Sequence, residues 1–200
     1  MQLDCPAIIC ALRLHGEHGV IVRALTPQAG LVVGYVRGGR SRTARPVLIA
    51  GNKVTLSLRA RHAEQLASMT VELLESRAPL MAEALAAAAI EWVTALAAAT
   101  LPEDQPCPDI YEALDGLLTA IAAAPSARRW AGALILFERA LMQALGYGGT
   151  IPDLAEDWPS VMAGLNANAA ALARHLLGDR RRDILAARER LVDRLKRAVA

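Results

Sequence analysis

The chain has 200 residues, of which 54% are apolar, 21% are charged and only 4% are aromatic, with a formal net charge of +2. This length allows one large domain or two small ones around a real core, and the scarcity of aromatic residues leaves alanine, leucine and valine to pack it, mostly in helices. The cysteines are odd in number, far apart and without a C-x-x-C pair, which indicates free, buried thiols in a reducing cytoplasm and not a disulfide framework: Cys5, Cys10 and Cys107.

The small net charge hides a segregation along the chain. Residues 1–78 carry ten basic and five acidic side chains, and residues 174–200 carry nine basic and four acidic ones. Residues 79–173 carry three basic side chains against eleven acids. Two basic surfaces flanking an acidic middle favour nucleic acid or acidic protein tails as partners.

The first part of the chain is predicted to be β. Apolar runs at 7–14, 20–26 and 31–36 end at Gly or Pro signals, and residues 47–61 and 69–74 alternate between apolar and polar, with a turn at Gly51-Asn52. Five short strands with such spacing predict a small closed barrel or sandwich.

From Pro79 onward the period of the apolar residues becomes helical, and five helices are predicted. They cover 79–99, 108–124, a stretch from a Ser126 cap to Gly146, a stretch from an Asp157 cap to Gly178, and a last one from an Asp179 cap. On the last helix Ile184, Leu191, Leu195 and Val199 are expected on one face and the arginines on the others. The predicted fold is a two-domain α+β protein, with a β-barrel at 1–78 and an all-helical domain at 79–200.

Residues 80–99 contain two glutamates, so a soluble helix is expected there instead of a membrane span.

Residues 37–46, the arginine loop, read RGGRSRTARP and contain four arginines and no acid. Adjacent glycines let a backbone approach a ligand, and guanidinium groups donate paired hydrogen bonds to phosphate. A basic loop between barrel strands is typical of oligonucleotide binding, and because Tyr35 is the module's one aromatic residue, binding is expected to depend on the nucleic-acid backbone. The alternative is a solubilising loop. The candidate nucleic-acid contacts are Arg23, Arg37, Arg40, Arg42, Arg45 and Lys53.

Several short motifs in this order resemble the RecO family of bacterial recombination mediators. They are residues 7–12 with Gly16-Glu17, Leu25-Thr26, Gly30-Leu31, 38–41, 46–48, and the run 137–141 followed by Leu145-Gly146-Tyr147. The likeness covers about residues 5–150. It implies an N-terminal OB-fold, binding of single- and double-stranded DNA, strand annealing, and a cytoplasmic, nucleoid-associated role in DNA repair.

The resemblance also implies protein partners. These are RecR, the acidic C-terminal tail of single-stranded DNA-binding protein, and RecA, which the family helps to load. The tail is expected in an apolar groove edged by arginine in the helical domain, with the candidate residues Arg128, Arg129, Phe137, Arg139 and Leu141. Many family members carry a four-cysteine zinc cluster there, but this chain has no cysteine after Cys107, so a metal-free protein is expected.

An enzymatic interpretation has little support in the sequence. His15 and Glu17 fit half of a zinc-deaminase motif, but Ile110 stands where Pro106-Cys107 would require a second cysteine, and three protein ligands are needed. A phosphate-binding G-x-x-x-x-G-K-[ST] loop is absent as well. We therefore expect a non-enzymatic protein without a cofactor. An adaptor whose basic surfaces bind acidic protein tails, with no direct DNA contact, remains the alternative.

Overall fold

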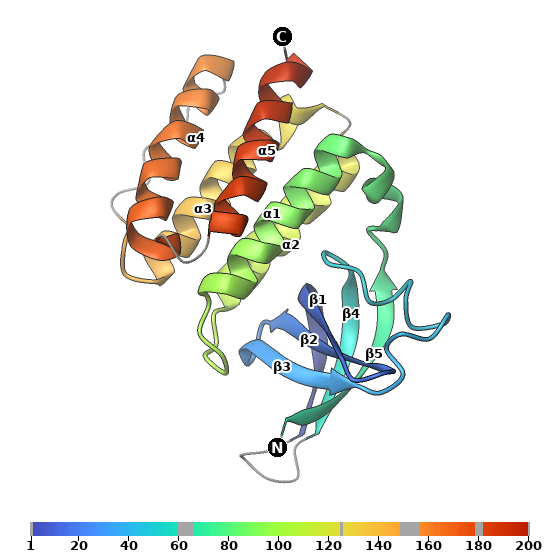
Figure 1. The fold of residues 1–200 in the computed structure, drawn as a ribbon. Helices are drawn as coiled ribbons and strands as arrows, with labels where there is room; N and C mark the ends of the chain where they lie inside the picture. The colour runs from blue at the N-terminus through green and yellow to red at the C-terminus, as the bar shows by residue number, and fades with distance from the viewer. Residues whose placement is uncertain (1, 60–65, 125, 149–156, 179–181, 200) are drawn as a thin grey trace.

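The computed structural model describes residues 2–59, 66–124, 126–148, 157–178 and 182–199. Its first five elements are the strands β1 (Gln2–His15), β2 (Gly19–Thr26), β3 (Gly30–Val36), β4 (Lys53–Arg59) and β5 (Ala67–Glu75). They close into a barrel in the order β1-β2-β3-β5-β4 (Figure 1). All pairings are antiparallel except β3 with β5, which closes the barrel in parallel. The predicted closed barrel of OB-fold type is confirmed.

Alternation along the strands fills the barrel. Ile9, Val22, Val32, Leu56 and Met69 point into one interior cluster. The register of β1 with β2 shifts between Ile9 and Ala11, so a bulge interrupts the alternation there. Gly51 and Asn52 form the predicted turn before β4, and Asn52 fixes it by donating from its side-chain amide to the carbonyls of residues 46 and 47.

The helical part follows β5. It contains a 3₁₀ helix η1 (Ala78–Ala82), α1 (Ala84–Thr100), α2 (Pro108–Ala123), a 3₁₀ turn η2 (Ala127–Arg129), α3 (Ala131–Ala144), α4 (Trp158–Leu172), a π-helical turn η3 (Ala173–Leu177) and α5 (Arg182–Val199). None of the helices in this described part of the chain has the length and apolar character that crossing a membrane requires.

Two predicted helix starts need correction. Pro79 lies in η1, and the extended backbone of Glu83 separates η1 from α1, so the first α-helix begins at Ala84. Ser126 makes no side-chain capping bond, because the chain continues from it into η2 and not into an α-helix. The Asp157 cap is confirmed, since its carboxylate accepts from the backbone N–H of Ser160. The cap predicted at Asp179 lies outside the described residues.

Barrel and helices share one apolar core. Ile8, Cys10, Leu25 and Leu31 face outward from β1, β2 and β3 and belong to the same buried cluster as the residues of α1 and α2. Figure 1 shows α1 and α2 above the barrel at this point. The helices therefore cover part of the outer face of the β1-β2-β3 sheet.

On α5 the predicted apolar face is only partly right. Leu191 and Leu195 are buried as expected, and Ile184 packs against the core. The side chain of Val199 lies outside the described set. Arg188, expected on the solvent side with the other arginines, is buried, with its side chain 6% exposed.

Candidate nucleic-acid interface

The arginine loop is a sequence of hydrogen-bonded turns. The backbone N–H of Ser41 donates to the carbonyl of Gly38, that of Arg45 donates to Ser41, and those of Val47 and Leu48 donate to Ala44. The loop is therefore preorganised on the barrel, which reduces the entropy lost when it meets a ligand.

Its two adjacent glycines serve different purposes. Gly38 has φ +67°, a conformation that an L side chain rarely adopts. Gly39 has an ordinary φ, but an added Cβ would lie 2.8 Å from Cγ2 of Val20 and 3.0 Å from Leu48. The glycine pair thus fixes a turn and a close approach of the loop to the barrel, whereas the sequence suggested a close approach of the backbone to a ligand.

All four arginines of the loop are exposed, but two of them also hold it in place. Arg40 donates from Nη1 to the carbonyl of Glu17, at 2.8 Å, and Arg45 donates from Nε to the carbonyl of Arg40, at 3.1 Å. Within the described residues, none of the recorded ion pairs involves Arg37, Arg40, Arg42 or Arg45. Most of their N–H donors are thus available to an external anion.

The loop lies between two hollows. One hollow, of about 370 Å³, lies between Arg37 and β5. Its polar lining residues are Ser41 and Thr43 of the loop and Ser68 and Thr70 of β5. The other, of about 230 Å³, has an apolar floor edged by two arginines, and its lining consists of Leu12, Leu14, Val20, Gly39, Arg40, Arg45 and Leu48. An extended ligand could follow the loop on either side. The second hollow could not be predicted from the sequence, because its floor comes from three separate segments.

The other two barrel candidates are engaged by carboxylates of the helical part. Nζ of Lys53 lies 2.5 Å from Oδ2 of Asp115 on α2, and this hydrogen bond raises the pKa of Lys53. Nη2 of Arg23 lies 3.0 Å from Oε1 of Glu103, in the segment between α1 and α2. Both side chains thus connect the barrel to the helices, and the structure does not bring them together with the arginine loop.

The helical candidates are divided between core and surface. Phe137 and Leu141 are 1% and 0% exposed, so neither side chain is available to line a surface groove. Arg139 is half-buried and donates from Nε to Oδ1 of Asn168. Arg128 and Arg129 are exposed on η2, and the guanidinium of Arg128 lies 5.7 Å from the centre of the Trp158 ring.

A surface groove does exist beside η2, with other residues. A hollow of about 320 Å³ lies between the start of α1 and the end of α2, and it is lined by Leu80, Glu83, Leu85, Ala86, Ile121, Ala122, Ala124 and Trp130. Arg128 and Arg129 directly precede Trp130 in the chain, and neither is among the residues that line the groove. We call it the η2 groove.

The three cysteines are free, and burial raises the pKa of each thiol, that of Cys10 to about 12. Such thiols are poor nucleophiles and poor metal ligands at neutral pH. In the described part of the chain, no three His, Cys, Asp or Glu side chains are grouped as a metal site would require. His15, the residue of the broken deaminase motif, instead packs edge-on against Tyr35, with ring centres 5.8 Å apart.

Comparisons with known proteins identify the family. Residues 1–77 match the family model described as recombination protein O N terminal, and residues 81–157 match that described as recombination protein O C terminal. The chain is 36% identical over 149 residues to the DNA repair protein RecO of Caulobacter sp. and 41% identical over 151 residues to that of Chelativorans sp.. Each alignment covers 74% of this chain, but only 60% and 58% of the relative.

A third relative matches from end to end. The DNA repair protein RecO of Jannaschia sp. is 32% identical over 249 aligned positions, which cover 100% of this chain and 98% of the relative. Both modules and the whole chain are thus accounted for, and the protein belongs to the RecO family.

Proposed function

We propose that the protein is a non-enzymatic DNA repair and recombination mediator that binds single- and double-stranded DNA. The observation that carries the proposal is the arginine loop, which presents four exposed guanidinium groups on a closed barrel. Family membership supports the role in repair, since the similar proteins are named DNA repair protein RecO.

The loop is suited to phosphate in particular. Its donors are permanently charged, can pair with two phosphate oxygens at once, and stand on a backbone already held by hydrogen bonds. Phosphate contacts position a strand without reading its sequence, which is what the annealing of arbitrary complementary strands requires. Arg23 and Lys53 are held by carboxylates, so we place the centre of the interface on Arg37, Arg40, Arg42 and Arg45.

We further propose that the helical part receives the acidic C-terminal tail of single-stranded DNA-binding protein in the η2 groove. The groove supplies an apolar surface for apolar side chains of the peptide, and Arg128 and Arg129, which precede its lining residue Trp130 in the chain, supply positive charge for the acidic ones. Contact with RecR and loading of RecA onto coated DNA complete the proposed role, and they rest on the family alone.

Salt titration separates DNA binding from the adaptor alternative. A protein that neutralises phosphates loses affinity linearly in log salt, with a slope of about −0.7 per contact on single strands and about −0.9 on duplex. We expect oligonucleotides of defined and of random sequence to bind alike. The slope of log affinity against log salt should correspond to several phosphate contacts. An adaptor would bind an acidic tail peptide and leave both DNA forms unbound at moderate salt, and that result would replace the proposal.

A further inference from the structure

The helices cover only part of the outer face of the β1-β2-β3 sheet. Leu25 and Leu31 mark the covered part, where they join the core of the helical part. Farther along the same strands, Arg13 on β1 pairs with Ile21 on β2, which pairs with Tyr35 on β3. Because these paired residues share one face of the sheet, they form a row beyond the helices.

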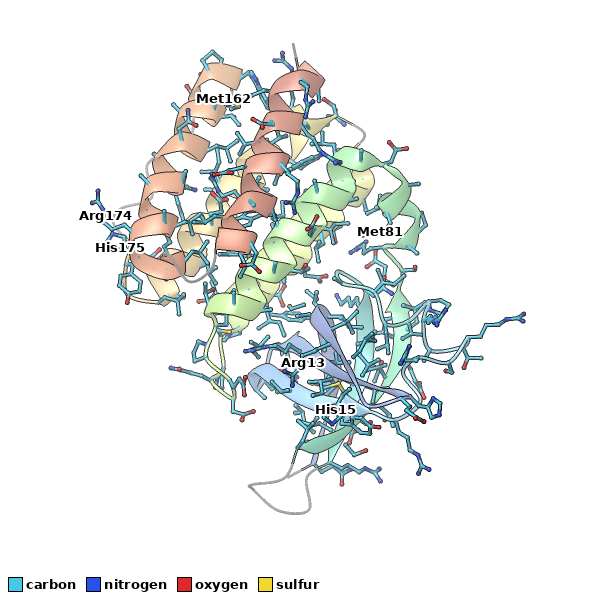
Figure 2. The ribbon with its side chains drawn as sticks, in the orientation of Figure 1. Arg13, His15, Met81, Met162, Arg174 and His175 are labelled. Carbon is cyan, nitrogen blue, oxygen red and sulfur yellow. The ribbon has the colours of Figure 1, made fainter. Side chains whose placement is uncertain are left out.

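The ring of Tyr35 packs over Gly19, where the absence of a side chain leaves room for it. A Cβ at Gly19 would overlap with the ring atoms and hydroxyl of Tyr35, so the ring lies directly over the start of β2. His15, which pairs with Gly19 across the hairpin, meets the ring edge-on at an interplanar angle of 80°. Arg13 and His15 both lie on the barrel in Figure 2 and are exposed, and Tyr35 is half-buried. We call Arg13, His15 and Tyr35 the aromatic platform.

The row nearer the helices adds a second arginine. Arg23 pairs with Ala11 and Val33, and its side chain is 35% exposed while Nη2 contacts Glu103. Glu103 is thus already paired with Arg23, and Oε2 of Glu17, on the hairpin between β1 and β2, lies 3.8 Å from Nε2 of His18. Arg13 lies in the same row as Tyr35 and Arg23 in the next row, so the face that carries the ring also carries positive charge for the phosphates on either side of a stacked base.

We infer that the aromatic platform stacks one or two unpaired nucleobases and so gives the protein a preference for single strands. The inference rests on the proposed function, and it adds a base-stacking site to the phosphate contacts of the arginine loop. Base stacking on an aromatic side chain tolerates any sequence, because every base has a π face. Bases in a duplex are already stacked on each other, so the platform contributes nothing to duplex binding. The helices that cover the sheet around Leu25 and Leu31 limit the site to a short stretch of strand.

The test compares three ligands of equal length: an oligothymidylate, the same strand with abasic sites, and a blunt duplex. Tyr35→Leu should weaken oligothymidylate binding by roughly 5- to 100-fold and leave the abasic strand and the duplex unchanged, since stacking alone is lost. Tyr35→Phe, which keeps the ring, is the matched control and should bind as the parent does. Gly19→Ala should reproduce the loss by displacing the ring, with its fold checked by circular dichroism.

Crosslinking gives a positive readout. Irradiation of a strand that carries 5-iodouracil should attach it to Tyr35 or His15, as read by mass spectrometry of the digest.

Two results of the binding test would overturn the platform and leave the proposed function standing. One is an equal loss of affinity for the thymidylate and the abasic strand in Tyr35→Leu. The other is no loss of affinity in Tyr35→Leu while arginine-loop variants weaken binding. A Tyr35→Leu defect confined to acidic peptides would make the patch a protein surface instead. If the parent binds none of the three ligands, the proposed function itself fails.

Discussion

The carboxylate of Glu138 on α3 and the guanidinium of Arg188 on α5 form a two-pronged ion pair inside the helical part, with Nε–Oε1 at 2.8 Å and Nη2–Oε2 at 2.9 Å. Trp92 of α1 and Asn168 of α4 each donate a further hydrogen bond to the same carboxylate, both at 2.9 Å. Arg188 also donates to the carbonyl of Leu165. Both charged groups thereby have hydrogen-bond partners within the protein, and one carboxylate connects four helices.

Breaking this pair from one side should destabilise the protein strongly. Arg188→Met removes the cation and leaves a buried carboxylate, which typically costs about 3–5 kcal/mol. The unfolding free energy from urea denaturation measures the loss. The double variant Glu138→Leu/Arg188→Met should recover much of it, because no unpaired charge then remains. Additive losses in the double variant would show that the two groups are not coupled.

The sequence contained the signal for this pair. Arg188 stands three and seven residues before Leu191 and Leu195, on the same helical face, and Glu138 stands three residues before Leu141. Opposite charges on the apolar faces of two helices predict a buried partner for each. The rule that arginines face solvent argues against a buried Arg188, and only the folded structure shows that its side chain on α5 reaches Glu138 on α3.

The barrel was predicted more completely than the site, for a physical reason. Gly and Pro separate the strands, and alternation is a local property, so β2 and β3 were placed within one residue of their ends. The cover of Ile8 and Leu25 by α1 and α2 depends on contacts between distant segments, and so do the hollows beside the arginine loop. The sequence alone could therefore not predict these features, and only the folded structure shows them.

The contact between Lys53 and Asp115 should contribute stability up to alkaline pH. The hydrogen bond to Asp115 raises the folded-state pKa of Lys53 above its ordinary value of 10.5, so its contribution is fully present below that value and is lost as the pH rises through the raised pKa. Lys53→Met should cost roughly 1 kcal/mol at neutral pH for this partly exposed pair. Thermal unfolding from neutral to strongly alkaline pH checks it, and the difference between parent and variant should shrink at the alkaline end. A difference that stays constant would assign the loss to packing.

The two glycines of the arginine loop should respond differently to substitution. Gly38→Ala should cost about 1 kcal/mol, because of its positive φ, and Gly38→Asn should cost less, since asparagine tolerates this conformation. Gly39→Ala should destabilise through overpacking against Val20, by about 1–3 kcal/mol. Combining Gly39→Ala with Val20→Ala should relieve part of that cost, whereas Gly38→Ala should gain nothing from it. Chemical denaturation of the five variants provides the comparison.

Variants of η2 test the proposed tail site. Arg128→Ala/Arg129→Ala should weaken the binding of an acidic tail peptide about tenfold in calorimetry at low salt, since two exposed positive charges on η2 are removed. Arg139 is held by Asn168, so it is not suited to this test, and Arg174, exposed on η3, is the better control. Equal effects of the double variant and Arg174→Ala would indicate general attraction with no site. Unchanged affinity in the double variant would remove η2 from the interface.

The arginine loop should act on DNA through phosphates, and the structure shows which arginines give the clearest result. Arg40 and Arg45 donate to the loop's own surroundings, so their removal can disturb its shape, whereas Arg37 and Arg42 make no hydrogen bond recorded within the described residues. Arg37→Ala/Arg42→Ala should therefore flatten the salt slope of log affinity by about 1.4 on single strands and about 1.8 on duplex, if both touch phosphate. The loss should be alike for all sequences, because phosphate contacts carry no base information.

Arg40→Ala/Arg42→Ala should flatten the slope as much, and any additional loss that is independent of salt would measure the part that Arg40 plays in holding the loop to the carbonyl of Glu17. A merely solubilising loop would act by long-range attraction, which fades within a Debye length of about 10 Å at 0.1 M salt and leaves the slope nearly unchanged. Circular dichroism of Arg37→Ala/Arg42→Ala should match the parent, since both side chains are exposed and outside the core. If this variant is folded and keeps the parent's affinity and salt slope, the loop is a solubilising one and the DNA contact lies elsewhere on the barrel.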